Sequence, residues 1–270
     1  MMRRDQVLQL GTGLYHDFLE NYGLAVETDE AEYIHQFRVA VKKLRALAFF
    51  LTTDRPEAAV LLDSEHLTAC IQPVYKSAGK VRNLQVLLDV LGGFTWPGPE
   101  GFRQHIYEQL HQRKLVFLQE AQLAALLSPR AWFAELDTLV RAHPETLETS
   151  VEQVVGDLAG RAFSLMQASG PGEDWHEARS CFKKAAHLLL MAGELGLASP
   201  GQHRFMPFRE AEQLLGTWHD FYMLGRFMDK YLAVLGRREK GWDELEAEYL
   251  EQVRQIELAV RDLPERFPLA

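Results

Sequence analysis

One pattern of basic residues occurs twice in this sequence, and its residue types are those that bind anions. Residues 35–43 and residues 176–184 both read His-x-x-Arg-x-x-x-Lys-Lys. At about 100° per residue, an α-helix places the histidine, the arginine and the first lysine of each copy on one face. Arginine can contact two phosphate oxygens at once, and lysine adds a compact positive charge. The pattern therefore predicts two helices that each present a basic stripe to an anion.

In each copy, one further basic residue or histidine outside the repeated pattern falls on the same helix face as the stripe. Apolar residues such as Phe37 and Phe182 fall on the opposite faces, which we expect to pack into the core. Nearby cations should lower the pKa of both stripe histidines. For the histidines taken alone, a packed or capping role is an alternative at least equal to contact with the ligand. The stripe residues are His35, Arg38, Lys42 and Arg45 in the first copy, and His176, Arg179, Lys183 and His187 in the second.

The first stripe lacks the acidic neighbours that would neutralise it on an ordinary surface. No Asp or Glu occurs between residues 35 and 45, although the chain has 38 acidic and 29 basic side chains. Like charges on one helix face repel by about 0.2–0.5 kcal/mol per pair, whereas a charge-assisted hydrogen bond to an anion contributes about 1.5–3 kcal/mol. A single basic face is most simply solvated surface, but its repetition favours a ligand.

Helices are the only regular elements that the sequence predicts. Only four Ile occur, while Leu, Ala, Glu and Gln are abundant, and this bias favours helix over strand. Apolar residues recur every three or four positions, so we expect about nine or ten helices with short connections. Helix starts or loops are expected at 54–56, 92–99, 128–129, 143–144, 168–172 and 198–201, and Pro73 is expected to start or kink a helix.

A second pair of matching segments indicates an internal duplication. Residues 79–84 (Gly-Lys-Val-Arg-Asn-Leu) parallel residues 216–221 (Gly-Thr-Trp-His-Asp-Phe), and each segment follows its stripe at nearly the same distance. Two matches in the same order are hard to obtain by chance. We therefore predict an all-α fold: one domain over 1–270, made of two pseudo-symmetric four-helix bundles packed together, with repeats at 1–142 and 144–270.

Composition excludes several other classes. Two cysteines cannot form a disulfide framework, which favours a reducing compartment. No signal-like or membrane-spanning apolar run occurs, so a cytoplasmic protein without membrane contact is expected. The net charge of −9 and the lack of aromatic residues among the basic ones argue against nucleic acid as ligand. No Cys-x-x-Cys pair, complete zinc-helix signature or glycine-rich phosphate loop is present, so neither a metal nor a cofactor is expected.

The paired His-x-x-Arg-x-x-x-Lys-Lys helices, each followed by a Gly-x-x-Arg/His-Asn/Asp helix, resemble the CHAD family (conserved histidine α-helical domain) over nearly the whole chain. The resemblance implies that inorganic polyphosphate binds, without being transformed, in a basic groove between the bundles. Some members are fused to or encoded near CYTH-type triphosphatases, and some associate with polyphosphate granules, so these are the further partners that it suggests.

The resemblance also extends the set of candidate binding residues. It includes the stripe residues and adds the second lysine of each pattern, although these two lysines point about 100° away from the stripes. Two lysines on the helix after the first stripe either line the same groove or belong to solvated surface. The added residues are Lys43, Lys184, Lys76 and Lys80.

The sequence departs from the family pattern at several positions. Ala186 stands where another basic residue is expected, and His187 is a candidate substitute. Asn83 replaces the more usual acid, and His219 stands where an arginine is common. Together with the negative net charge, these departures predict weaker or more salt-sensitive binding than a strongly basic relative would show.

Two functions of other classes stay open at this stage. One is a phosphohydrolase in which His35 or His176 acts as general acid or nucleophile. The other is an interaction scaffold whose stripes meet an acidic protein partner. Hydrolysis of polyphosphate by the pure protein would favour the first, and partner capture that depends on the stripe arginines would favour the second.

Overall fold

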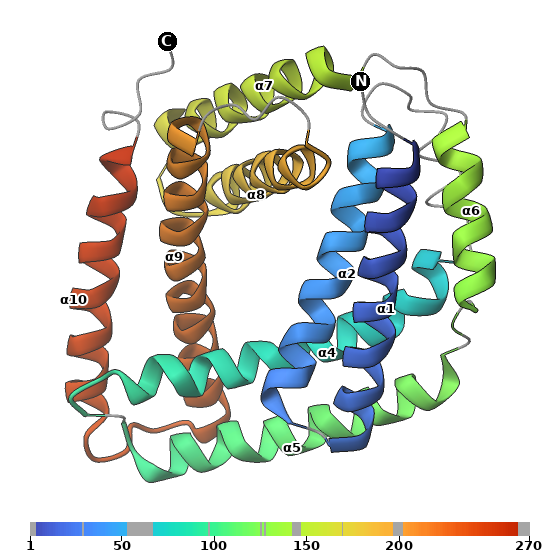
Figure 1. Ribbon diagram of the computed structural model, residues 1–270. Helices are drawn as coiled ribbons and strands as arrows, with labels where there is room; N and C mark the ends of the chain where they lie inside the picture. The colour runs from blue at the N-terminus through green and yellow to red at the C-terminus, as the bar shows by residue number, and fades with distance from the viewer. Residues whose placement is uncertain are drawn as a thin grey trace.

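The computed structural model describes residues 4–28, 30–52, 67–96, 98–124, 126, 128–141, 147–168, 170–196 and 202–263. All regular elements in these ranges are α-helices, which confirms the predicted fold class (Figure 1). None of them is long and apolar enough to cross a bilayer. The helices are α1 (Arg4–Thr28), α2 (Ala31–Thr52), α4 (Leu67–Gly92), α5 (Glu100–Leu123), α6 (Pro129–Arg141), α7 (Leu147–Ala168), α8 (Glu173–Glu194), α9 (Gln202–Leu235) and α10 (Trp242–Arg261).

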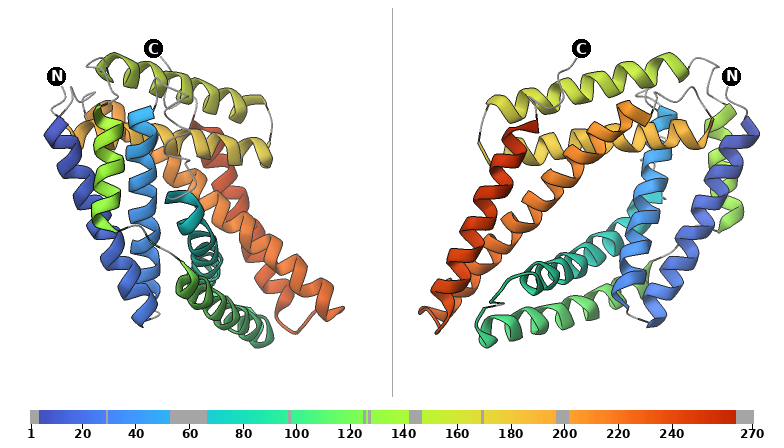
Figure 2. Two further views of the ribbon diagram at one scale, coloured as in Figure 1. Left: turned by 90° about the vertical axis from the view of Figure 1, so that its right-hand side faces the viewer. Right: turned by 60° about the vertical axis from the view of Figure 1, so that its left-hand side comes forward.

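The helices pair to form the four sides of a frame (Figures 1 and 2). The pairs are α1 with α2, α4 with α5, α7 with α8, and α9 with α10, and α6 packs on α1. One helix of each pair, namely α2, α4, α8 or α9, lies on the inner side of the frame (Figure 1). Both α2 and α9 pack on α4 and on α8, so the four inner helices close a ring. This ring brings α2 and α8, the helices that carry the basic stripes, into direct contact.

Local sequence explains where several helices begin and end. Ser128 caps α6, because its Oγ accepts a hydrogen bond of 3.2 Å from the backbone N–H three residues later, and Pro129 takes the first helical position. The breaks predicted at 92–99 and 168–172 separate α4 from α5 and α7 from α8. Pro73 lies inside α4, so a helix start there is excluded. The breaks predicted at 54–56, 143–144 and 198–201 lie outside the described residues.

The apolar faces opposite the basic stripes are buried, as predicted. Phe37 and Val41 of α2, and Phe182 and Ala185 of α8, are at most 3% exposed. One hydrophobic cluster joins α2 and α8 to side chains from α1, α4, α5, α6 and α7, and a second joins α4 and α5 to α9 and α10. Both clusters cross the predicted repeat boundary near residue 143, so the two predicted repeats share their cores. Their status as separate bundles stays a prediction.

Candidate functional site

The two basic stripes meet where α2 packs against α8. Lys42 of α2 and Lys183 of α8 lie within hydrogen-bonding reach of each other. Arg38 and Arg179 are close enough to act on the pKa of both lysines, and His187 joins them from the next turn of α8. We call these five residues, two from the first stripe and three from the second, the cation cluster.

Burial and mutual repulsion make the cation cluster costly in the free protein. Burial, followed by the charges of Lys183 and the two arginines, lowers the pKa of Lys42 to about 7. Burial, followed by Arg179, lowers the pKa of Lys183 as well. Burial, followed by the two lysines, lowers the pKa of His187 to about 4, so this imidazole is neutral at pH 7. An anion placed among these groups would oppose each of these shifts.

Several donors around the cluster have no acceptor from the protein. Within the described ranges, the arginines and lysines of the cluster form no salt bridge. Glu212 of α9 acts on both lysines only through space. The Nε of Arg179 is buried without a hydrogen-bond partner. Each unpaired buried donor costs about 1–3 kcal/mol, so the site has both charge and hydrogen-bonding capacity for an anion.

Tyr75 of α4 holds two arginines of the first stripe in place. The Nη1 of Arg38 donates a hydrogen bond of 2.8 Å to the Tyr75 carbonyl oxygen. The guanidinium carbons of Arg38 and Arg45 lie 4.4 and 4.3 Å from the centre of the Tyr75 ring, which is cation–π distance. Arg45 also donates to the Gln72 Oε1 at 2.5 Å. These contacts fix both arginines before a ligand binds, and sequence reasoning missed Tyr75.

Arg38 and Arg179, the matched arginines of the two stripes, each lie beside the glycine of a matched segment. A Cβ at Gly79 of α4 would lie 2.7 Å from the Nη1 of Arg38, and a Cβ at Gly216 of α9 would lie 4.0 Å from the Nε of Arg179. The same kind of contact therefore joins α2 to α4 and α8 to α9. The space that the Arg38 side chain occupies explains why the first segment carries glycine at this position.

Alanine at these two glycines should have opposite effects on stability. Glycine inside a helix costs about 0.5–1 kcal/mol relative to alanine, and the new Cβ of Gly216→Ala meets Arg179 at an ordinary contact distance. We expect that variant to gain about this amount of unfolding free energy. Gly79→Ala displaces Arg38 from the Tyr75 carbonyl, and we expect a net loss of up to about 1 kcal/mol. Urea denaturation measures both, and equal stabilisation would contradict the placement of Arg38.

The two stripe histidines have lowered pKa values, as predicted, but in different surroundings. Burial, followed by the charge of Arg82, lowers the pKa of His35. Burial, followed by His219, lowers the pKa of His176, whose ring lies 4.8 Å from that of Tyr222. Burial is therefore a larger cause than the cations that the sequence pointed to. Arg82 and His219 occupy the same position in the two matched segments, and the predicted site omitted both.

Lys76 and Lys80 lie apart from the contact between α4 and α2. Both side chains are exposed, and neither is among the charges that act on the cluster. The face of α4 that meets the first stripe is that of Tyr75 and Gly79, about 100° from these lysines. The geometry therefore favours the solvated-surface alternative for them.

The second lysines of the pattern also lie off the cluster. Lys43 is half-buried, and it is not among the charges that shift the pKa values of the cluster. Lys184 is exposed and acts on Cys181, whose thiol pKa is raised chiefly by burial. Ala186 is 5% exposed and lies seven residues after Arg179, on the stripe side of α8, so the cluster lacks a cation at the position that Arg45 takes in the first copy. His187, one position later, is the residue that reaches it.

These features define an all-helical protein in which two helices of repeated sequence carry one shared, half-buried group of unneutralised cations. The family model for the CHAD domain matches residues 12–229, so the chain belongs to the CHAD domain family. The fold is similar to the crystal structure of the CHAD domain from the plant Ricinus communis, with a TM-score of 0.65 and 16% identity, over 99% of this chain and 88% of that chain. No curated protein matches the sequence.

Proposed function

We propose that the protein binds inorganic polyphosphate, or a similar linear polyanion, at the cation cluster and does not transform it. One observation carries this proposal: Lys42 and Lys183 meet at half-buried positions, with two arginines beside them and no salt bridge in the described ranges. Such an arrangement is unfavourable without an anion and favourable with one. The family resemblance supports polyphosphate as that anion.

The aromatic residues near the cluster favour a phosphate polymer over nucleic acid. A single strand gains much of its affinity from bases that stack on open aromatic rings. Here the Tyr75 ring is covered by the guanidinium groups of Arg38 and Arg45, and Trp218 is 2% exposed. Polyphosphate has no bases, so the absence of open aromatic rings does not weaken its binding.

The titration behaviour of the histidines supports binding without hydrolysis. A general acid must carry a proton near the working pH. The pKa values of His35, His176 and His187 are all lowered, and that of His187 falls to about 4. Neutral imidazoles at pH 7 argue against a histidine as the general acid, and the assay for released phosphate tests the remaining role of a histidine as nucleophile. We therefore expect no phosphate release when the pure protein is incubated with polyphosphate, as a colorimetric phosphate assay would show.

A gel-shift titration with long-chain polyphosphate and with DNA of matched charge tests the proposed function. We expect the native chain to retain polyphosphate at lower protein concentration than DNA, and Arg38→Glu/Arg179→Glu to retain neither. Far-UV circular dichroism establishes that the variant is folded. Equal retention of both polymers by the native chain would count against a polyphosphate site. Unchanged polyphosphate retention, with loss of an acidic protein partner, would favour the scaffold.

Binding should weaken steeply with salt. The cluster offers two arginines and two lysines, and contacts from all four should give a slope of about −3 for log affinity against log salt. This slope corresponds to roughly 50-fold weaker binding at 200 mM than at 50 mM salt. Fluorescence anisotropy of labelled polyphosphate at several salt concentrations measures it, and a slope near zero would exclude electrostatic capture.

The proposal extends to where the protein acts. A polyphosphate-binding CHAD domain belongs in the cytoplasm, where polyphosphate granules and a CYTH-type triphosphatase are its candidate partners. A fluorescent fusion should concentrate with polyphosphate granules, and Arg38→Glu/Arg179→Glu should disperse it. If the fusion stays diffuse although the purified protein binds polyphosphate, the proposed granule association is wrong and the proposed binding stands.

A further inference from the structure

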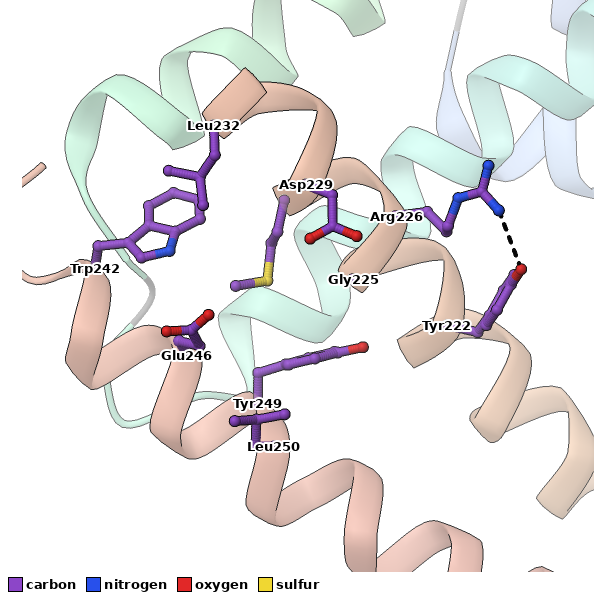
Figure 3. A pocket seen from close by; sticks show the side chains of 10 residues that line it. Tyr222, Gly225, Arg226, Asp229, Leu232, Trp242, Glu246, Tyr249 and Leu250 are labelled. Carbon is purple, nitrogen blue, oxygen red and sulfur yellow. Dashed lines mark hydrogen bonds between the residues drawn. The ribbon is translucent and has the colours of Figure 1, made fainter. Parts of the chain in front are cut away.

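A cavity between α9 and α10 lies apart from the cation cluster (Figure 3). Its volume is about 260 Å³, which at roughly 30 Å³ per water is space for about eight or nine waters. It is lined by both apolar and polar groups, and its rim reaches the surface at Leu250, which is 58% exposed. The lining residues include Met228, Asp229, Trp242, Glu246, Tyr249 and Leu250.

One wall of the cavity carries a buried donor without a partner. Trp242 is fully buried, with its ring stacked on Tyr231 at 5.8 Å between centroids and set edge-on to Phe102 at 5.3 Å. These contacts fix the indole, yet its Nε1–H has no hydrogen-bond acceptor. The nitrogen is on the side of the ring that faces the cavity (Figure 3). Because the nitrogen itself is buried, a ligand acceptor satisfies it only when the cavity lining shifts to admit the acceptor.

Asp229 supplies a free negative charge at the same cavity. Its carboxylate is exposed and has no salt bridge or hydrogen bond within the described ranges. Glu246, by contrast, is already paired with Arg238 at 2.7 Å. The guanidinium of Arg226, which also lines the cavity, donates to Tyr222 at 3.2 Å (Figure 3). Of the two carboxylates that line the cavity, Asp229 is therefore the one without an ion pair in the described ranges.

An aromatic ring lies opposite this carboxylate. The Tyr249 side chain faces Asp229 across the cavity (Figure 3), and the charge of Asp229 adds to burial in raising the Tyr249 pKa. The Tyr249 hydroxyl lies so close to Gly225 that a Cβ there would collide with it, which fixes the ring. A carboxylate and the face of a phenol ring are both groups that attract an organic cation.

We propose that this cavity binds a small organic ammonium ion that also carries a hydrogen-bond acceptor, as an amino alcohol does. The ammonium group is held by Asp229 and the Tyr249 ring, and the acceptor receives the Trp242 Nε1–H. The carbon chain between them packs on Met228 and Leu250. This site is separate from the polyanion site and takes a ligand of opposite charge.

The test is a titration of the full chain with 4-amino-1-butanol, followed by the indole N–H signals in ¹H–¹⁵N NMR spectra. The chain has five Trp, and the signal that disappears in Trp242→Phe identifies the reporter. We expect a saturable shift of the Trp242 signal. The neutral analogue 1-butanol should bind about tenfold more weakly, because it lacks the charge-assisted hydrogen bond.

Two variants decide between a specific site and a general acidic surface. Asp229→Asn should weaken binding of 4-amino-1-butanol by about tenfold. Glu244→Gln removes an exposed charge of the same sign that does not line the cavity, and it should leave the titration unchanged. The proposal is overturned if no Trp242 shift occurs, if 1-butanol shifts it equally, if Asp229→Asn binds as the native chain does, or if Glu244→Gln weakens binding equally.

Discussion

Replacement of Lys42 and Lys183 by methionine should abolish polyanion binding and, at the same time, stabilise the protein. Each lysine offers a charge-assisted contact of about 1.5–3 kcal/mol to a phosphate, so loss of both should weaken polyphosphate binding at least about 100-fold. Their burial beside each other is unfavourable in the free protein, as the lowered pKa values of both show. Methionine fills similar space without charge, and we expect the unfolding free energy to rise by roughly 1–2 kcal/mol.

The matched control for this variant removes the same number of charges elsewhere. Lys76→Met/Lys80→Met also loses two lysines, but both side chains are exposed on a face of α4 away from the cluster. We expect its polyphosphate affinity to fall less than about threefold and its unfolding free energy to change by less than about 0.5 kcal/mol. Anisotropy titrations and urea denaturation measure both quantities. If the two double variants lose affinity equally, net charge rather than the cluster controls binding.

If the double lysine variant binds polyphosphate more weakly and is also more stable, the two lysines serve binding rather than folding. A structural role for Lys42 and Lys183 predicts that their removal lowers stability, because a buried charge that is part of the fold is paired with an opposite charge. Within the described ranges these lysines have no such pair. Proteins keep unfavourable groups of this kind where a ligand needs them.

Helical periodicity alone was enough to predict much of this site. The faces that carry Arg38 and Arg179 follow from residue spacing, because a helix fixes which side chains share a side. The matched glycines were also visible in the sequence, although their reason, space for the arginines, is a contact between helices. The same periodicity separates Lys76 and Lys80 from the Gly79 face, so their position off the cluster was within reach of sequence reasoning.

Other parts of the site depend on which helices meet, and sequence spacing does not contain that information. The contact of Tyr75 with both Arg38 and Arg45 requires α4 to pack on α2 at one particular register. The large pKa shift of Lys42 requires α8 to bring Lys183 against it. The cavity beside Trp242 likewise arises only when α10 packs on α9. Each of these features joins residues far apart in the chain.

The same two lysines predict that pH acts on stability and on binding in opposite directions. The folded-state pKa of Lys42 is about 7, below the value of about 10.4 for an unfolded lysine. Between these values the unfolded chain holds the extra proton, so this group makes the unfolding free energy rise with pH above 7. Bound polyanion favours the charged lysine and raises its pKa, so binding takes up a proton in the same range.

Polyphosphate affinity should therefore fall as pH rises from 7 to 9, by roughly tenfold per pH unit for each proton taken up. Calorimetric titrations in two buffers of different ionisation enthalpy would give the proton uptake directly. Lys42→Met should bind more weakly at pH 7 and show a shallower pH dependence, whereas Lys76→Met should keep the native slope. An affinity that is constant between pH 7 and 9 would mean that Lys42 keeps its proton in the free protein, and the repulsion between the two stripes would then be too weak to define the site.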